Sequence, residues 1–469
     1  MATALRCGSA ALGFLLFPAM FSTPLPALAA TIEVAPVLSS GLVVALTPYG
    51  KAGPTVGNNN IASPVTIGGH LYIVSQRAAE LSILDATGGR RVVLDAAHLP
   101  AGVTPVGAQA LINIAGDAAR TYVGMNSATL PAGFAPPAPL PEAAAYDTAT
   151  FGYELIYAYG RAADGSLSNP VPVTAFETTG TGHRGEGMLV LPDGRLLYAR
   201  GDNVPASLNG LAAPQDPGST LSKLLVIDPV SGAVTVAASG LRNVQHLTYT
   251  SPERTEIAFG DIGWVAVEEV NRISVADLAD TAVIENFGWG ADANDLTREG
   301  SLVVNALGQV VGRTSPDDTA WRLPFAEFGR TATDGTALAV SGPAISAVSF
   351  SRIGMLFGDL VTGALFATLA TAGEGVPADV HRVLVAGPDG TALPLREALG
   401  LGRSRADLRF FTFGDGGAGL LLERSQQIYR ITEVMAPVPL PAGGALMLAG
   451  GPALWLLRRP FRKARARNG

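Results

Sequence analysis

The segment MLVLPDGRLLY, residues 188–198, places two short apolar runs on either side of a Pro-Asp-Gly turn. Short apolar runs bounded by turn formers are typical of β-strands, and Asp and Gly permit the tight backbone of a hairpin. Residues 81–94 and 224–236 repeat this arrangement, each with a turn that contains Gly. Further turns of similar composition follow at 163–165, 306–308 and 388–390. The chain therefore predicts a succession of β-hairpins.

Composition extends this interpretation to the whole chain. Gly occurs 56 times and Pro 33 times, whereas charged residues make up only 15%. Abundant turn formers with few charges favour many short strands over amphipathic helices. Hairpins repeated over roughly 400 residues predict an all-β fold, and suit a β-propeller better than a two-sheet sandwich. A β-solenoid is the alternative, although no short strict repeat is visible. Residues 394–399 alone predict a helical turn.

Residues 1–30 have the pattern of a secretory signal peptide. Arg6 supplies the positive charge, residues 10–21 are apolar, and Ala-Leu-Ala at 27–29 matches a cleavage site. A buried N-terminal helix is the alternative. The only cysteine, Cys7, lies inside this segment, so the mature chain is expected to contain no thiol. The formal net charge is -7, and no basic stripe with interleaved aromatics is present, which argues against nucleic-acid binding.

The C-terminal segment, residues 436–469, has three parts. Val-Pro-Leu-Pro-Ala at 438–442 precedes an apolar stretch, 443–457, and an Arg-rich end. The apolar stretch is short for a spanning helix, which needs ~17–25 residues. The tail resembles the VPLPA variant of the PEP-CTERM sorting signals, which exosortase-type enzymes of Gram-negative bacteria recognise at the membrane. A simple membrane anchor is the alternative.

The resemblance of the tail implies where the protein goes. It implies export across the inner membrane to the periplasm, the cell envelope or the extracellular space. It also implies transient membrane insertion of the C-terminal helix and an exosortase-type partner. Residues 31–435 remain as the propeller domain, between the signal peptide and the sorting helix.

Polar residues that can support chemistry follow one another through the middle of the chain. His183 precedes the first hairpin strand, and Asp202 follows the second after a spacing of nineteen residues. An imidazole takes protons near neutral pH, and a carboxylate can orient it. Arg242, Asn243 and Gln245 come next. Arginine and amides supply directional contacts to a planar polar cofactor.

The order and spacing of these residues resemble the glucose/sorbosone dehydrogenase family, the soluble pyrroloquinoline-quinone (PQQ) sugar dehydrogenases. The Pro-Asp-Gly turn at 192–194 and Asn-Phe-Gly-Trp at 286–289 belong to the same resemblance, which covers residues 62–432. It implies a six-bladed β-propeller, a PQQ cofactor, and oxidation of a sugar hydroxyl by hydride transfer to the quinone. It implies His183 as the base, Asp202 as its orienting partner, and cofactor contacts from Arg242, Asn243 and Gln245.

The resemblance implies further ligands. Arg403 and Arg405 would meet the quinone carboxylates, in a segment that is one residue longer than in the family. A calcium ion would be held by backbone carbonyls around Gly263, and Glu269 would bind a second calcium or be a solvated glutamate. Next to Gly263, Trp264 stands where the family has proline. It would either fill the cofactor space or stack on a planar ring.

Other departures keep a second function open. Glu186 replaces a glycine of the family pattern, and no lysine lies between Lys223 and Lys463, so the family's cofactor-binding lysine has no counterpart. The sequence therefore predicts an exported PQQ-dependent aldose dehydrogenase-like protein. The alternative is a non-catalytic surface propeller that binds polysaccharide or a protein partner.

Overall fold

The computed structural model describes most of the chain between Val37 and Glu433. The described residues are 37–53, 61–85, 87–106, 110–140, 151–180, 182–184, 186–203, 213–280, 282–292, 294–315, 317–318, 320–330, 344–346, 348–351, 354–369, 377–402 and 406–433. The predicted signal peptide and sorting tail lie outside them. None of the helices in the described part is long and apolar enough to span a bilayer.

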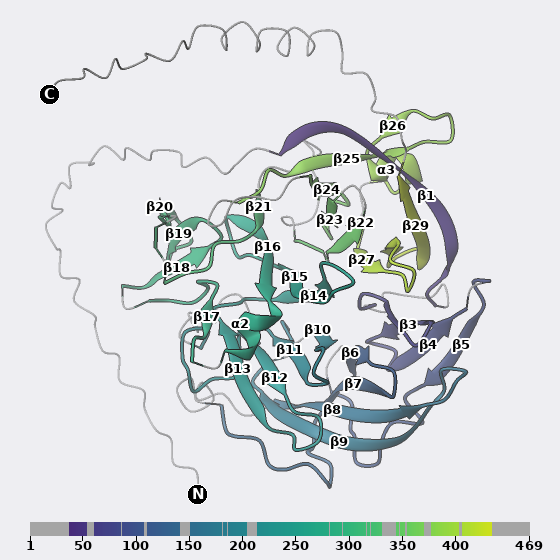
Figure 1. The fold of residues 1–469 in the computed structure, drawn as a ribbon, viewed down its shortest axis with the longest axis vertical. Helices are drawn as coiled ribbons and strands as arrows, with labels where there is room; N and C mark the ends of the chain where they lie inside the picture. Colours follow the sequence, from purple (N-terminus) through teal and green to yellow (C-terminus); the bar gives the residue numbers. More distant parts are fainter. Residues whose placement is uncertain are drawn as a thin grey trace, which may run out of the picture. The chain divides into compact units, whose positions relative to one another are not determined.

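Nearly all regular structure is β, and most strands belong to antiparallel sheets joined by short turns (Figure 1). The first sheet contains β2 (Val65–Ile67), β3 (His70–Ser75), β4 (Glu80–Leu84) and β5 (Arg90–Leu94). The second contains β6 (Leu111–Gly116), β7 (Arg120–Ser127), β8 (Gly152–Arg161) and β9 (Leu167–Thr178).

Two further sheets carry the residues of the predicted site. The third contains β10 (Gly187–Val190), β11 (Leu196–Arg200), β12 (Lys223–Ile227), β13 (Val234–Ser239) and the short parallel strand β17 (Glu285–Asn286). The fourth contains β14 (Val244–Tyr249), β15 (Glu256–Asp261), β16 (Val267–Ser274) and β21 (Ala326–Gly329). A small three-stranded sheet contains β18 (Leu296–Glu299), β19 (Leu302–Asn305) and β20 (Val310–Arg313).

The remaining strands form one nine-stranded sheet. Its members are β22 (Ser349–Ser351), β23 (Gly354–Gly358), β24 (Leu365–Thr368), β25 (His381–Ala386), β26 (Ala392–Leu393), β27 (Leu408–Thr412), β28 (Ala418–Leu422), β29 (Gln427–Glu433) and β1 (Leu38–Lys51). The long strand β1 pairs in parallel with β25 and antiparallel with β29 (Figure 1). β1 therefore joins the group β22–β25 to the group β27–β29, and both groups come from the C-terminal part of the described chain.

Helix is scarce in the described residues. α2 (Val275–Ala279) begins after Ser274, whose hydroxyl accepts a hydrogen bond from the Asp277 backbone N–H. α3 (Leu395–Leu399) ends at Gly400, whose φ of 62° suits the left-handed conformation that closes many helices. α3 confirms the helical turn predicted at residues 394–399.

The first strands of successive sheets contact one another. β10 contacts β6 and β14, and β27 contacts β2 and β22. Apolar side chains fill the spaces between adjacent sheets: Tyr72 and Leu155 lie in one such cluster, and Tyr198 lies in the next. Sheets that pack face to face in succession, each with its first strand inside, form a β-propeller. The predicted all-β propeller is confirmed, whereas the number of blades stays a prediction.

Candidate functional site

His183 and Asp202 meet at one end of the hairpin β10–β11. Gly187 pairs with Ala199 in this hairpin, so the segment before β10 and the segment after β11 leave it at the same end. The His183 Nδ1 atom lies 2.7 Å from Asp202 Oδ1, and the His183 side chain is 24% exposed. An ionised carboxylate only accepts hydrogen bonds, so Nδ1 is the donor in this pair, and Nε2 is the acceptor nitrogen of the neutral imidazole. This is the arrangement of a histidine base with an orienting carboxylate.

The backbone around this pair leaves room for no side chain at Gly201. A Cβ there would lie 2.2 Å from the His183 carbonyl oxygen, closer than any real contact. His183 itself has a φ of 47°, a left-handed conformation that costs a non-glycine residue ~1 kcal/mol or more. The Asp202 N–H donates to the Arg242 carbonyl at 2.9 Å. The pair is thereby fixed to the segment that precedes β14.

Arg242 and Asn243 are anchored by a buried carboxylate. Their backbone N–H groups donate to Asp261 Oδ2 and Oδ1 at 2.9 and 2.6 Å. Burial raises the pKa of Asp261 to about 6, and the charge of Asp202 also raises it. The hydrogen bonds from the Arg242 and Asn243 backbone lower the same pKa. Asp261, at the end of β15, therefore links the Arg-Asn segment to the His183–Asp202 pair. Asp261 was not among the residues predicted from the sequence.

The Arg242 guanidinium turns toward the segment after β15. Its Nη1 donates to the carbonyl oxygens of Ile262 and Gly263 at 3.0 and 2.7 Å, and its Cζ lies 5.5 Å from the Trp289 ring centroid. Trp264 packs edge-on against Trp289, with ring centroids 6.0 Å apart. In this arrangement Trp264 belongs to an aromatic pair beside Arg242.

Gln245 meets an arginine that was not predicted from the sequence. Arg409, on β27, donates from Nη1 to Gln245 Oε1 at 2.6 Å, and the same nitrogen lies 3.7 Å from Glu186 Oε2. The predicted Arg403 and Arg405 lie outside the described residues. Arg409 follows Arg403 and Arg405 in the same Arg-rich stretch of sequence. That Arg-rich stretch was the available signal.

The predicted calcium ligands already have hydrogen-bond donors. The Gly263 carbonyl accepts hydrogen bonds from two guanidinium groups, those of Arg242 and Arg330, at 2.7 and 2.8 Å. Glu269 uses one oxygen for the Gly300 N–H at 2.5 Å and the other for the Asn271 amide at 3.0 Å. Within the described ranges, no cluster of three or more His, Cys, Asp or Glu side chains could hold a metal ion. A cation would have to displace a guanidinium donor at the Gly263 carbonyl, and at Glu269 it would share a carboxylate that already accepts two hydrogen bonds.

The described residues near the His183–Asp202 pair suit a planar polar cofactor better than they suit calcium. Asn243 Oδ1 and Arg409 Nε are buried and have no hydrogen-bond partner among the described residues. Unpaired buried polar atoms are costly, so such atoms beside a histidine–carboxylate pair suit a polar ligand. Lys223 offers no such group, because its Nζ donates to three backbone carbonyls at 2.8 to 3.0 Å.

Solved structures with the same fold include sugar dehydrogenases. The PQQ-bound aldose sugar dehydrogenase of Streptomyces coelicolor is 17% identical, with a TM-score of 0.53 over 84% of this chain and 100% of that one. An oxidoreductase of Thermus thermophilus, described as a glucose dehydrogenase, is 15% identical, with a TM-score of 0.51 over 83% and 99%. No family model and no curated protein matches by sequence. At these identities the likeness establishes the fold.

Proposed function

We propose that this protein is an exported oxidoreductase of the PQQ-dependent aldose dehydrogenase type. The observation that carries the proposal is the 2.7 Å contact between His183 and Asp202, fixed beside Arg242. The fold shared with the S. coelicolor aldose sugar dehydrogenase, solved with PQQ, supports it. Residues 1–30 and 436–469 support export across the inner membrane and sorting of the tail by an exosortase-type enzyme.

In the proposed reaction, His183 is the general base. The sugar hydroxyl transfers its proton to His183 Nε2 while the hydrogen on the same carbon leaves as hydride, so that the carbon becomes a carbonyl carbon. Asp202 keeps the other imidazole hydrogen at Nδ1 and stabilises the imidazolium that forms. Bound PQQ would supply the acceptor for the hydride. Asn243, Gln245 and Arg409 are the groups available to hold the quinone, and the proposal needs no calcium.

One observation favours a second function. Glu186 lies 3.7 Å from Arg409, so an anionic quinone would meet a carboxylate as well as a guanidinium. A propeller that has replaced cofactor contacts by internal ion pairs would instead be a surface protein that binds polysaccharide or another protein. Fold alone does not decide between the two functions.

A titration of the purified protein with PQQ, in buffer that contains EDTA, tests the proposal. Saturable binding, followed by the absorbance of the quinone, is the expected result for both wild type and His183→Ala, because His183 acts on the sugar. Absence of binding at high micromolar PQQ, by protein whose circular dichroism shows it folded, would favour the surface-propeller function.

A further inference from the structure

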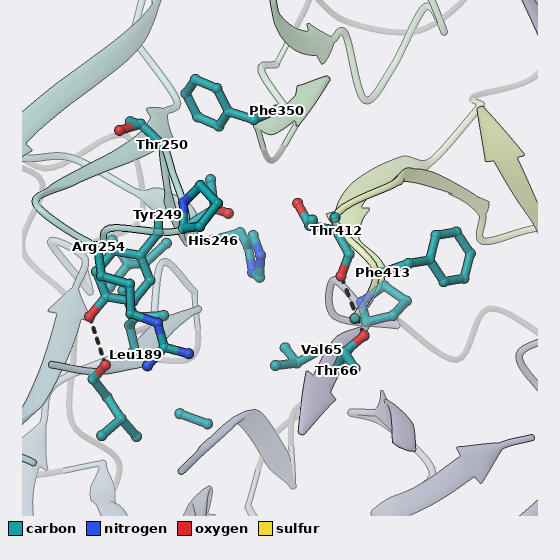
Figure 2. Close-up of a pocket in the computed structure, with 18 of the residues that line it drawn as sticks. Val65, Thr66, Leu189, His246, Tyr249, Thr250, Arg254, Phe350, Thr412 and Phe413 are labelled. Atoms are coloured by element: carbon teal, nitrogen blue, oxygen red, sulfur yellow. Dashed lines mark hydrogen bonds between the residues drawn. The ribbon is translucent and has the colours of Figure 1, made fainter. Parts of the chain in front are cut away.

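A cavity of about 610 Å³ lies at the other end of the strands that carry the proposed site. β10 begins four residues after His183 and β14 begins one residue after Asn243, and both strands run from there into the cavity wall. The wall also includes parts of β2, β22 and β27 and the turn after β14 (Figure 2). Its volume is within the range of ~300–1,000 Å³ typical of small-molecule sites.

His246 is the most unusual residue of this wall. Its φ is 99°, a conformation that a non-glycine residue rarely adopts and that is often found at functional positions. In Figure 2 its imidazole extends from β14 toward the side on which Thr66 and Thr412 lie. Burial and, secondarily, the charge of Arg409 lower the pKa of His246 to about 4. The ring is therefore neutral at pH 7, with one donor and one acceptor nitrogen.

Hydroxyl groups surround the same space. Thr66 and Thr250 donate only long hydrogen bonds, each 3.4 Å, to carbonyl oxygens. The Thr412 hydroxyl shares a hydrogen bond of 3.1 Å with Ser349. A hydroxyl that donates one hydrogen bond still has lone pairs that can accept. These groups can exchange hydrogen bonds with a ligand that carries several hydroxyls.

The two charged residues of the cavity wall, Asp415 and Arg254, both contact other side chains. Asp415 accepts two hydrogen bonds from Arg430, at 2.8 and 3.0 Å. The Arg254 guanidinium lies over the Tyr249 ring, 5.4 Å from its centroid. Phe350 adds an apolar ring to the wall. A lining of hydroxyls, aromatic rings and one neutral imidazole, with its one carboxylate paired to Arg430, matches a ligand that is hydroxylated at its edges and apolar on its faces.

We infer that this cavity binds a neutral carbohydrate, at a site separate from the His183–Asp202 pair. The Arg409 side chain contacts Gln245 and Glu186, which lie where β14 and β10 begin, on the side of the proposed site. Carbohydrate binding in the cavity does not depend on the proposed oxidoreductase activity. It would occur equally in a dehydrogenase with an additional sugar site and in a surface propeller without cofactor.

Saturation-transfer NMR and calorimetry on the protein without PQQ test this inference. The probes are the neutral trisaccharides maltotriose and cellotriose, with trigalacturonic acid as the charged comparison. The double variant Thr66→Val, Thr412→Val keeps the shape of the cavity and removes two hydroxyls. Thr235→Val, at an exposed position of β13, is the matched control. His183→Ala tests the opposite end of the strands.

The expected result is binding of at least one neutral trisaccharide, and none of the charged one. Affinity should fall at least tenfold in the double variant and stay unchanged in Thr235→Val and His183→Ala. Thermal denaturation checks that the double variant is folded. Equal binding by wild type and double variant, loss of binding in His183→Ala, or no binding of either neutral sugar would each overturn the inference. PQQ binding, measured separately, can succeed or fail independently.

Discussion

At the scale of single residues, the charge of Arg409 decides how the site can receive an anion. Its guanidinium is almost buried, with Glu186 3.7 Å away and the Gln245 amide oxygen at 2.6 Å. Two charges ~4 Å apart near a protein surface interact by a few kcal/mol, so Glu186 offsets much of the attraction that Arg409 would offer a carboxylate ligand. The carboxylate of Glu186 thus weakens the site for an anionic quinone.

Replacement of Glu186 by Gln should strengthen PQQ binding. The variant keeps the size of the side chain and removes one of the carboxylates that offset the charge of Arg409, while Glu423 remains. We therefore expect the Kd for PQQ to fall about tenfold, or ~1.4 kcal/mol. Glu397→Gln, at an exposed position of α3, is the matched control and should leave the Kd unchanged. Weaker binding in Glu186→Gln would indicate that Glu186 supports the cofactor site.

Asp202→Asn should slow the reaction without weakening cofactor binding. An asparagine can donate to Nδ1 and thereby favour the tautomer whose Nε2 carries the hydrogen, so His183 could no longer accept a proton there. By analogy with other histidine–carboxylate pairs, we expect kcat to fall by ~10²–10⁴. Steady-state dye reduction measures kcat, and a parallel titration measures the Kd for PQQ. An unchanged kcat would remove Asp202 from the mechanism.

The sequence predicted these residues to different degrees. The His183–Asp202 contact was predictable because the Pro-Asp-Gly hairpin between them fixes which strand ends meet. The environment of Gln245 was not, because Arg409 reaches it from a strand 164 positions further along the chain. The arginine donors on Gly263 were also missed, since a backbone carbonyl carries no sequence signal for its partner.

At the scale of elements, one buried ion pair joins the second and third sheets. Glu154 on β8 accepts from Arg200 Nε on β11 at 2.9 Å, and both side chains are fully buried. Tyr198 donates to the same glutamate oxygen at 3.2 Å. Arg200 precedes Gly201 and Asp202 directly, so this pair fixes the end of β11 on which the site is built.

Glu154→Gln should destabilise the protein strongly. Removal of one partner leaves the Arg200 charge buried without compensation, which typically costs ~3–5 kcal/mol. Urea denaturation measures the free energy of unfolding, with Arg195→Gln as the control because its partner Asp193 is half exposed. The control should lose less than ~1 kcal/mol. Similar losses in the two variants would contradict this account of the sheet interface.

Strands were predictable where their pairing is local. The hairpins β4–β5, β10–β11 and β12–β13 follow directly from turn residues between apolar runs. β1 was not predicted, because it pairs with β25 and β29, more than 330 residues later in the chain. β1 has no neighbouring hairpin turn that would predict it from the sequence. It is long because its first half pairs with β25 and its second half pairs with β29.

At the scale of the whole molecule, the protein should be stable without calcium. The carbonyls of the segment after β15 are held by the guanidinium groups of Arg242 and Arg330. A tightly bound structural ion at ~1,000 times its Kd would add ~4 kcal/mol to stability. We therefore expect EDTA to leave the Tm unchanged in a thermal scan. A fall in Tm that CaCl₂ restores would show that the protein holds a structural calcium ion and would contradict this prediction.

The central claim is that His183 removes a proton from a sugar whose hydride passes to PQQ. The most direct measurement is single-turnover reduction of PQQ-loaded protein by glucose, galactose or xylose, followed by the absorbance of the quinone. The account predicts reduction by at least one aldose in wild type, and a rate at least ~10²-fold lower in His183→Ala with PQQ still bound. Equal rates in the two proteins, or no reduction by any of these sugars while PQQ is bound, would contradict it.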